Sequence, residues 1–273
     1  MLNIIKRFLP RSAFYRNVLT MATGQVLAQG IIVLVSPVIS RLYSPEEIGL
    51  YAIFISATMM LLPLTSWRYE RAIVLPSVDD EASNVLVLTL IVTIVSSFLI
   101  FILIVFFHRS IDGLFETVQL IPWLWLLPVG VFVNRLNEAL SLWNLRKKRF
   151  KNIVAARVGQ AGSLAGTQVV TGMAGIGEGG LIGGYLLGWV VGAAILGLQI
   201  LRENFRLFRD SLRVSRMIYV LQKYRKFPIY STWGVLMNTS ANQIIPILLA
   251  VLYGPAVAGF YALGSRAVSA PAF

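Results

Sequence analysis

The feature that most constrains this chain is a series of apolar stretches, each long enough to cross a lipid bilayer. They lie at residues 18–40, 48–66, 84–107, 120–143, 153–172, 181–200 and 229–252, and an eighth begins near residue 257. A membrane-spanning helix satisfies all its backbone hydrogen bonds internally. Because 57% of the residues are hydrophobic and only 13% are charged, the composition excludes a soluble domain. The sequence predicts an all-α polytopic membrane protein.

Basic residues alternate between the two sides of the predicted spans. Most of the 24 Lys and Arg residues lie in the amino-terminal segment and after the second, fourth and sixth spans, whereas the opposite loops carry only Arg41 and Arg109. The positive-inside rule then places the amino terminus in the cytoplasm. The same rule accounts for the net charge of +12, so nucleic acid is not expected as a partner.

The segment after the sixth span has a regular spacing of arginines. Residues 202, 206, 209, 213 and 216 are all Arg and fall on one stripe of a single predicted helix, which would lie at the cytoplasmic lipid surface. Two interpretations remain open: an anchor that joins two lobes, and a docking surface for a lipid diphosphate.

The short polar turn between the first two spans carries a helix start signal. Ser44 is a suitable cap, Pro45 suits the first helical turn, and Glu46 and Glu47 place negative charge where the helix dipole favours it. The turn therefore predicts a hairpin of two spans.

The same hairpin occurs twice in the sequence. The motif LYSPEEIGLYA at 42–52 recurs as LYGPAVAGFYA at 252–262, and six spans separate the copies, so the repeat is parallel. We expect a six-span lobe at 1–201, a basic amphipathic cytoplasmic linker at 202–227 and the first hairpin of a second lobe at 228–273. A complete two-lobe protein would have about 420 residues or more and about twelve or more spans.

Polar and charged side chains inside predicted spans are costly in lipid and are candidates for a transport lumen. Arg135 and Glu138 lie three residues apart on one helix face, so a self-neutralised pair is the alternative. For the others, snorkelling and polar contacts between helices are the alternatives. The candidates are Gln25, Gln29, Arg41, Asn134, Arg135, Glu138, Arg157, Gln160, Asn238 and Asn242.

Enzymatic and metal chemistry have little support in the sequence. The chain has no Cys and a single His, so no metal site and no cofactor are expected, and an ion or proton gradient is the candidate energy source. The longest outer loop, near 108–119, offers only His108, Arg109, Asp112 and Glu116. No catalytic residue is therefore predicted.

Several ordered motifs resemble one known family. They are RLYSPEEIGLYA (41–52), RYERAIVLPSVDDEASNVL (68–86), WNLRKKRFKNIVAARVGQ (143–160) and YRKFPIYSTWGVLMNTSANQIIPILLA (224–250). Together they resemble the Wzx-type oligosaccharide or polysaccharide flippases, whose superfamily also includes multidrug exporters.

The resemblance implies two six-helix lobes that move polyprenyl-diphosphate-linked oligosaccharide across the bacterial inner membrane by alternating access. The implied partners are this lipid, the surrounding membrane lipids and the polysaccharide polymerase machinery. Arg41, Arg135 and Arg157 become the arginines expected to meet the anionic substrate. A multidrug-type exporter and a membrane polymerase or ligase are the alternatives.

Overall fold

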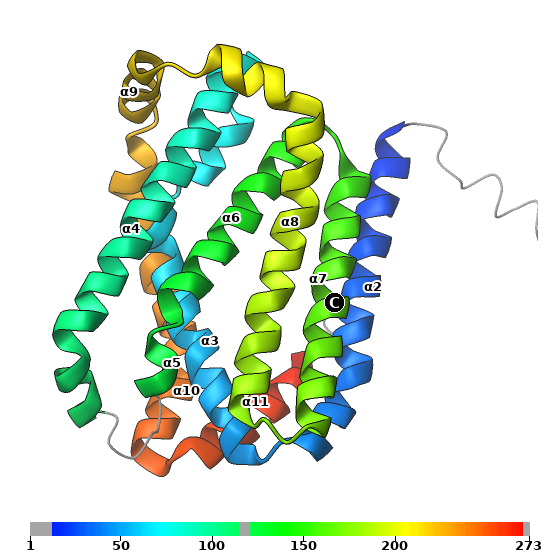
Figure 1. The fold of residues 1–273 in the computed structure, drawn as a ribbon, viewed down its shortest axis with the longest axis vertical. Coiled ribbons are helices and arrows are strands. Elements are labelled where there is room, and N and C mark those ends of the chain that lie inside the picture. The colour runs from blue at the N-terminus through cyan, green and yellow to red at the C-terminus, as the bar shows by residue number, and fades with distance from the viewer. Residues whose placement is uncertain (1–12, 115–120, 270–273) are drawn as a thin grey trace, which may run out of the picture.

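The computed structural model describes residues 13–114 and 121–269, without the side chains of 13–15, 108–114, 121, 203–207, 209, 210 and 266–269. Long helices run side by side along the molecule (Figure 1). The elements are α2 (Ala13–Leu42), α3 (Pro45–Ser66), a 3-10 helix η1 (Tyr69–Val74), α4 (Asp79–Leu114), α5 (Ile121–Leu124), α6 (Leu127–Arg146), α7 (Phe150–Met173), α8 (Glu178–Ser211), α9 (Val214–Lys223), a π-helix η2 (Phe227–Ser231), α10 (Thr232–Tyr253) and α11 (Pro255–Ser269).

Five of the described helices are long and apolar enough to cross a membrane. They are α2, α3, α4, α8 and the continuous stretch formed by η2 and α10. The predicted all-α polytopic membrane protein is confirmed. Two further predicted spans form helices, α6 with 20 residues and α7 with 24, but these are more polar than the other five. Since α6 packs against α3, α4 and α8, much of its surface faces protein.

The expected span at 120–143 is not one helix. The short helix α5 ends at Leu124, and a turn in which the Leu126 N–H donates to the Trp123 carbonyl precedes α6. Pro128 lies in the first turn of α6, where its missing N–H costs no hydrogen bond. The proline therefore marks the true start of this helix.

The helix start at residue 44 is confirmed in detail. The Ser44 side chain accepts a hydrogen bond from the Glu47 N–H at 3.2 Å, and the Glu47 carboxylate accepts one from the Ser44 N–H at 2.7 Å. This reciprocal pair is a capping box, which satisfies two backbone donors at the end of α3.

The helix expected to carry one stripe of arginines from 202 to 216 is interrupted. Helix α8 continues to Ser211, Leu212 and Arg213 adopt extended backbone conformations, and α9 begins at Val214. Arg213 and Arg216 therefore leave the line of the preceding arginines. The prediction of a single helix was wrong because spacing alone does not detect a change of direction.

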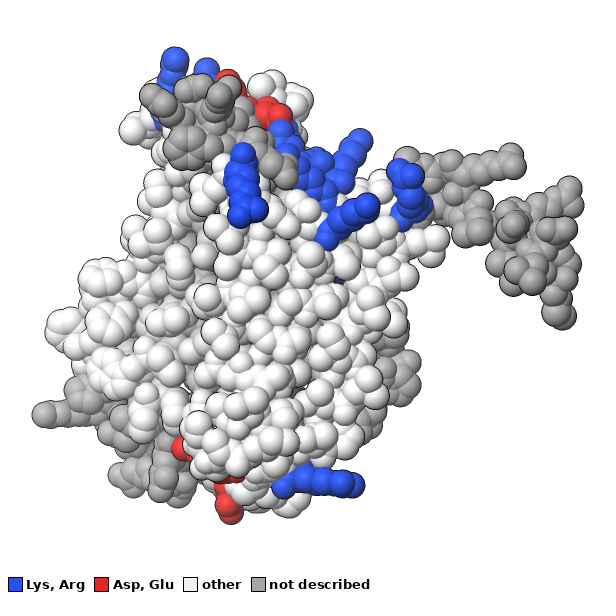
Figure 2. Space-filling model, turned by 45° about the vertical axis from the view of Figure 1, so that its right-hand side comes forward, with Lys and Arg blue, Asp and Glu red and all other residues white. Residues whose placement is uncertain are grey.

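Both hairpins turn at the same end of the molecule, as a parallel repeat requires (Figure 1). We call this the hairpin end, and the end where α3, α6 and α8 finish the basic end. Lys and Arg side chains gather at the basic end in Figure 2, above a broad band without charge.

The two copies of the repeated motif touch each other reciprocally. A Cβ atom added at Gly49 would overlap the carbonyl oxygen of Pro255, and one added at Gly259 would overlap the carbonyl oxygen of Pro45. Each glycine thus admits the backbone of the other copy, as small residues do where membrane helices cross closely. We call this contact between α3 and α11 the glycine crossing.

Gly49→Ala should therefore lower the melting temperature of the purified protein. The new methyl group meets backbone rather than a movable side chain, and such overpacking costs about 1–3 kcal/mol. Gly162→Ala is the matched control, because nothing lies within 4 Å of its added Cβ and alanine favours a helix. Equal melting temperatures for the two variants in a thermal unfolding assay would contradict a close crossing.

Candidate functional site

Five charged side chains meet near the basic end, where α3, η1 and α6 come together. They are Arg68, Glu70, Arg71, Arg135 and Glu138, and we call them the charged cluster. Three arginines face two carboxylates, so the cluster has a formal charge of +1. Charge of this kind is costly inside a helix bundle unless each group is paired.

Arg135 lies at the centre of the cluster and is almost fully buried. Its Nε donates to the carbonyl oxygen of Leu62 at 2.9 Å, which ties α6 to the last turns of α3. Its Nη1 donates to Glu138 and, at 3.4 Å, to Glu70. One guanidinium therefore serves two carboxylates from different elements.

Glu70 is completely buried but incompletely paired. Its Oε1 lies 3.4 Å from Arg135 and 3.7 Å from Arg68, while its Oε2 has no hydrogen-bond partner among the described residues. The Nε of Arg68 is buried without a partner as well. Burial lowers the pKa of Arg68, and Glu70 partly opposes this effect. The inner part of the cluster thus retains unused polar atoms.

The turn that holds these residues has an unusual backbone. Trp67 and Arg68 have φ values of 50° and 63°, in the left-handed region that few residues other than glycine adopt. Side-chain contacts hold the turn: Trp67 Nε1 donates to Ser96 at 3.2 Å, and Arg68 reaches Glu70. Strained backbone of this kind persists only when its surroundings determine it, and it concentrates at functional sites.

The outer edge of the cluster is accessible. Arg71 donates to Glu138 at 2.9 Å, and their side chains are 46% and 30% exposed. An anion that reached this edge could take the place of the Glu138 carboxylate beside Arg71, because phosphate oxygens and carboxylate oxygens accept the same hydrogen bonds. The arrangement is therefore suited to binding an anion.

The other predicted lumen residues do not join the cluster. Arg157 donates to Gln25 at 2.6 Å, across the contact between α7 and α2. Asn134 donates to the Tyr185 hydroxyl at 2.9 Å inside the bundle. Of the remainder, Gln29 and Gln160 are half-buried, and Arg41, Asn238 and Asn242 are exposed. The structure thus brings together Arg135 with Glu138, and Gln25 with Arg157.

Three members of the cluster were not predicted as site residues. The positive-inside rule explained Arg68 and Arg71 as markers of topology, and Glu70 received no role. The sequence did contain a signal for this site: Glu70 lies between Arg68 and Arg71, directly after the second span. An acidic residue between two arginines suggests that their side chains pair locally. Among the described residues, no group of three His, Cys, Asp or Glu side chains could hold a metal ion.

Comparison with known proteins gives one family match. The family is described as "Polysaccharide biosynthesis protein", and its model matches residues 38–272, which include the charged cluster and both hairpin turns. Searches of curated proteins and of solved structures gave no match.

Arg135→Gln should destabilise the protein strongly. It removes the shared partner of Glu70 and Glu138, and breaking a buried ion pair costs about 3–5 kcal/mol. Arg71→Gln is the control, since this partly exposed pair is worth about 1 kcal/mol or less. Denaturant unfolding of both variants checks the difference, and similar losses would contradict the central position of Arg135.

Proposed function

The chain belongs to the polysaccharide biosynthesis protein family, and from that premise we propose that it is a lipid-linked oligosaccharide flippase. It moves a polyprenyl-diphosphate-linked oligosaccharide from the cytoplasmic to the periplasmic leaflet of the bacterial inner membrane. The product supplies a surface polysaccharide such as the O-antigen of lipopolysaccharide.

The charged cluster is the observation that carries this proposal. A diphosphate is a strong anion, and the cluster offers a surplus positive charge with an accessible arginine at its edge. Glu138 lies at that edge, paired with Arg71. When the diphosphate arrives, it takes the place of Glu138 beside Arg71, and Arg135 continues to hold the carboxylate inside the protein.

The paired hairpins support alternating access. In transporters built from parallel repeats, two lobes rock about a central substrate site. The glycine crossing closes the hairpin end because α3 and α11 touch there through their backbones. Release of the substrate at that end requires the two helices to separate.

The distribution of charge supports the direction of transport. The positive-inside rule assigns the basic end to the cytoplasm (Figure 2). The charged cluster lies toward this end, since it is built from the last turns of α3 and from η1. It is therefore placed to receive the diphosphate from the cytoplasmic leaflet.

The alternatives fit the site less well. An exporter of cationic drugs would need a cavity with surplus acidic groups, and the charged cluster has the opposite balance. A polymerase or ligase would need convergent acid-base or nucleophilic groups in a sheltered pocket. The longest outer loop, near 108–119, lies outside the described side chains. We therefore propose a transporter without enzymatic activity, driven by an ion or proton gradient and working beside the polymerase machinery.

The first test is the leaflet in which lipid-linked oligosaccharide accumulates in cells that lack the gene. A lectin or glycosidase added outside spheroplasts should fail to reach it, because assembly on the cytoplasmic leaflet continues while crossing stops. Accessible but unpolymerised oligosaccharide would contradict the proposal and favour an enzyme that acts after the crossing.

Arg71→Gln should reduce transport without unfolding the protein. Loss of a hydrogen bond to a charged group costs about 1.5–3 kcal/mol, which weakens substrate binding roughly 10-fold or more. Surface polysaccharide in complemented cells measures the effect, and Arg71→Lys should retain part of the activity. Lys151→Gln is the control, because Lys151 is an exposed basic residue on α7, outside the cluster. Equal transport by the Gln variants would exclude Arg71 from the site.

A further inference from the structure

Three consecutive acidic residues at the start of α4 each bind a different segment of the basic end. The first, Asp79, binds the end of α6: its two oxygens lie 3.2 Å from Arg146 Nη2 and 2.5 Å from Lys147 Nζ. Because these three carboxylates follow one another on a first helical turn, they point to different sides of α4.

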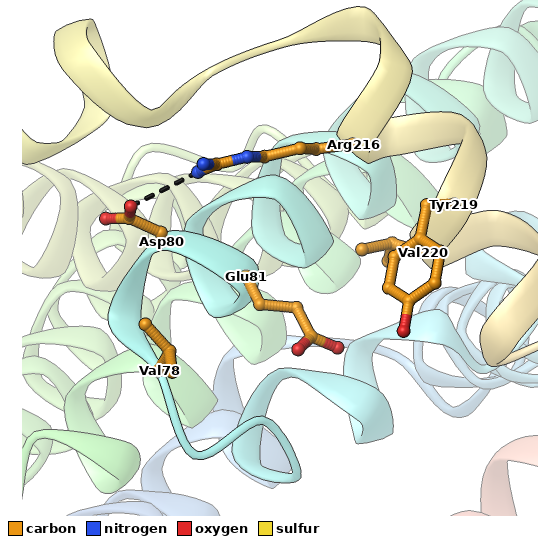
Figure 3. A pocket seen from close by; sticks show the side chains of 6 residues that line it. All are labelled: Val78, Asp80, Glu81, Arg216, Tyr219 and Val220. Carbon is orange, nitrogen blue, oxygen red and sulfur yellow. Dashed lines mark hydrogen bonds and ion pairs between the residues drawn. The ribbon is translucent and has the colours of Figure 1, made fainter.

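The second, Asp80, binds the junction between α8 and α9. It accepts a hydrogen bond from the Ser211 hydroxyl at 2.7 Å and pairs with Arg216 at 3.2 Å, the contact drawn in Figure 3. One turn later, Asn84 donates to the Ser211 carbonyl at 3.0 Å and accepts from the Arg213 N–H at 3.2 Å. The break between the two helices is thus held by side chains of α4.

The third, Glu81, binds the end of α9. It lies 2.6 Å from Lys223 Nζ and accepts from the Tyr224 hydroxyl at 2.9 Å. The hydrogen bond that Lys223 donates to Glu81 raises the pKa of Lys223, so this ion pair persists at neutral pH and is lost only as the pH rises through the raised value. From η1, the Tyr69 hydroxyl donates to the Leu221 carbonyl at 3.2 Å.

A small open pocket lies beside these contacts, between α4 and α9. It has a volume of about 250 Å³, and Figure 3 shows Glu81, Tyr219 and Val220 among its lining residues. Val220 is completely buried on the side of α9 that faces α4. Helix α9 is therefore attached at its start, middle and end to α4 and η1.

Shortly after α9, the backbone changes from an α-helix to a π-helical turn. Residues Phe227–Ser231 form a π-helical turn, in which the Thr232 N–H donates to the Phe227 carbonyl five residues back. No residue of this turn is fully buried, and it contains Pro228. Residues 227–265 contain no charged side chain, and Phe227 packs against the buried cluster that includes Tyr69 and Val220. Short π-helical turns are rare and frequently occur at functional positions.

We propose that α9 moves as part of the first lobe and that the two lobes pivot at the π-helical turn Phe227–Ser231. Asp80 and Glu81 act as positioning residues. Because they fix α9 to α4, the rotation between the lobes begins after α9, at the π-helical turn. The inference rests on the proposed transport function and adds the location of its pivot.

The pivot and the glycine crossing lie at opposite ends of α10. Helix α10 begins at the π-helical turn and leads at its other end into α11, which carries the crossing glycine Gly259. A rotation at the turn is therefore amplified along about 30 Å of helix, since each residue contributes 1.5 Å. In the proposed movement, a small rotation at the basic end becomes a larger displacement at the hairpin end, and α10 and α11 give up part of their packing against α3.

The 273 residues contain no Cys, so introduced cysteines are the only labelling sites in this part of the protein, and any Cys elsewhere in the whole protein would first be replaced. We would attach spin labels to two pairs of exposed positions, Ser215→Cys with Lys151→Cys and Ser215→Cys with Met237→Cys. The first pair joins α9 to α7 and the second joins α9 to α10. Distances would be measured in the whole protein, reconstituted in vesicles with and without a polyprenyl diphosphate.

The proposal predicts that the polyprenyl diphosphate leaves the first distance unchanged and shifts the second. If both distances shift, α9 moves independently of the first lobe, which overturns the pivot but leaves the transport function standing. If neither distance shifts while the lipid binds, α10 does not rotate relative to the first lobe at the π-helical turn, which also overturns the pivot. The leaflet assay tests the flippase function separately.

Removing the two positioning carboxylates provides a second variant. Asp80→Asn with Glu81→Gln should broaden the distance distribution of the Ser215–Lys151 pair, because α9 loses its ion pairs with Arg216 and Lys223. Glu46→Gln, an exposed change at the hairpin end, should not. An unchanged, narrow distribution in the Asp80 and Glu81 variant would show that these residues do not hold α9.

Discussion

The structure depends on the neutralisation of arginine and lysine by carboxylates that come from one short connection. The segment between α3 and α4, together with the first turn of α4, supplies Glu70, Asp79, Asp80 and Glu81. These four residues reach basic groups on α6 and α9 and bind the end of α8 through Ser211. A membrane protein that collects positive charge on one side must limit its self-repulsion there, and this connection supplies the opposite charge.

The two ends of the bundle are held by different forces. At the basic end, ion pairs and hydrogen bonds join segments distant in the sequence. At the hairpin end, the glycine crossing joins α3 to α11 through backbone contact. Backbone packing depends steeply on distance because it has no long-range component, whereas charge attraction declines slowly. A backbone contact of this kind is lost over a short separation, so under the proposed transport function the glycine crossing is the contact suited to open, while the ion pairs keep the basic end assembled.

The sequence determined the class of fold through the length and spacing of its apolar stretches. It also determined the hairpin turn at Ser44, because a capping box is a local pattern, and the parallel orientation of the two hairpins, because an even number of spans separates them. A pair between Arg135 and Glu138, three residues apart on one helix, was one of the two interpretations that the sequence left open, and the structure contains that pair. Each of these features depends on residues close together in the chain or on a simple count of spans.

Only the tertiary structure decided which distant groups share a site. Glu70 and Arg71 reach Arg135 and Glu138 because α3 and α6 pack together, and no local pattern records that contact. The break at Leu212 likewise follows from the hydrogen bonds of Asn84 with Ser211 and Arg213, since arginine spacing alone was compatible with one straight helix. Local geometry sets helices, caps and turns, whereas the pairing of buried charges is set by the packing that brings the helices together.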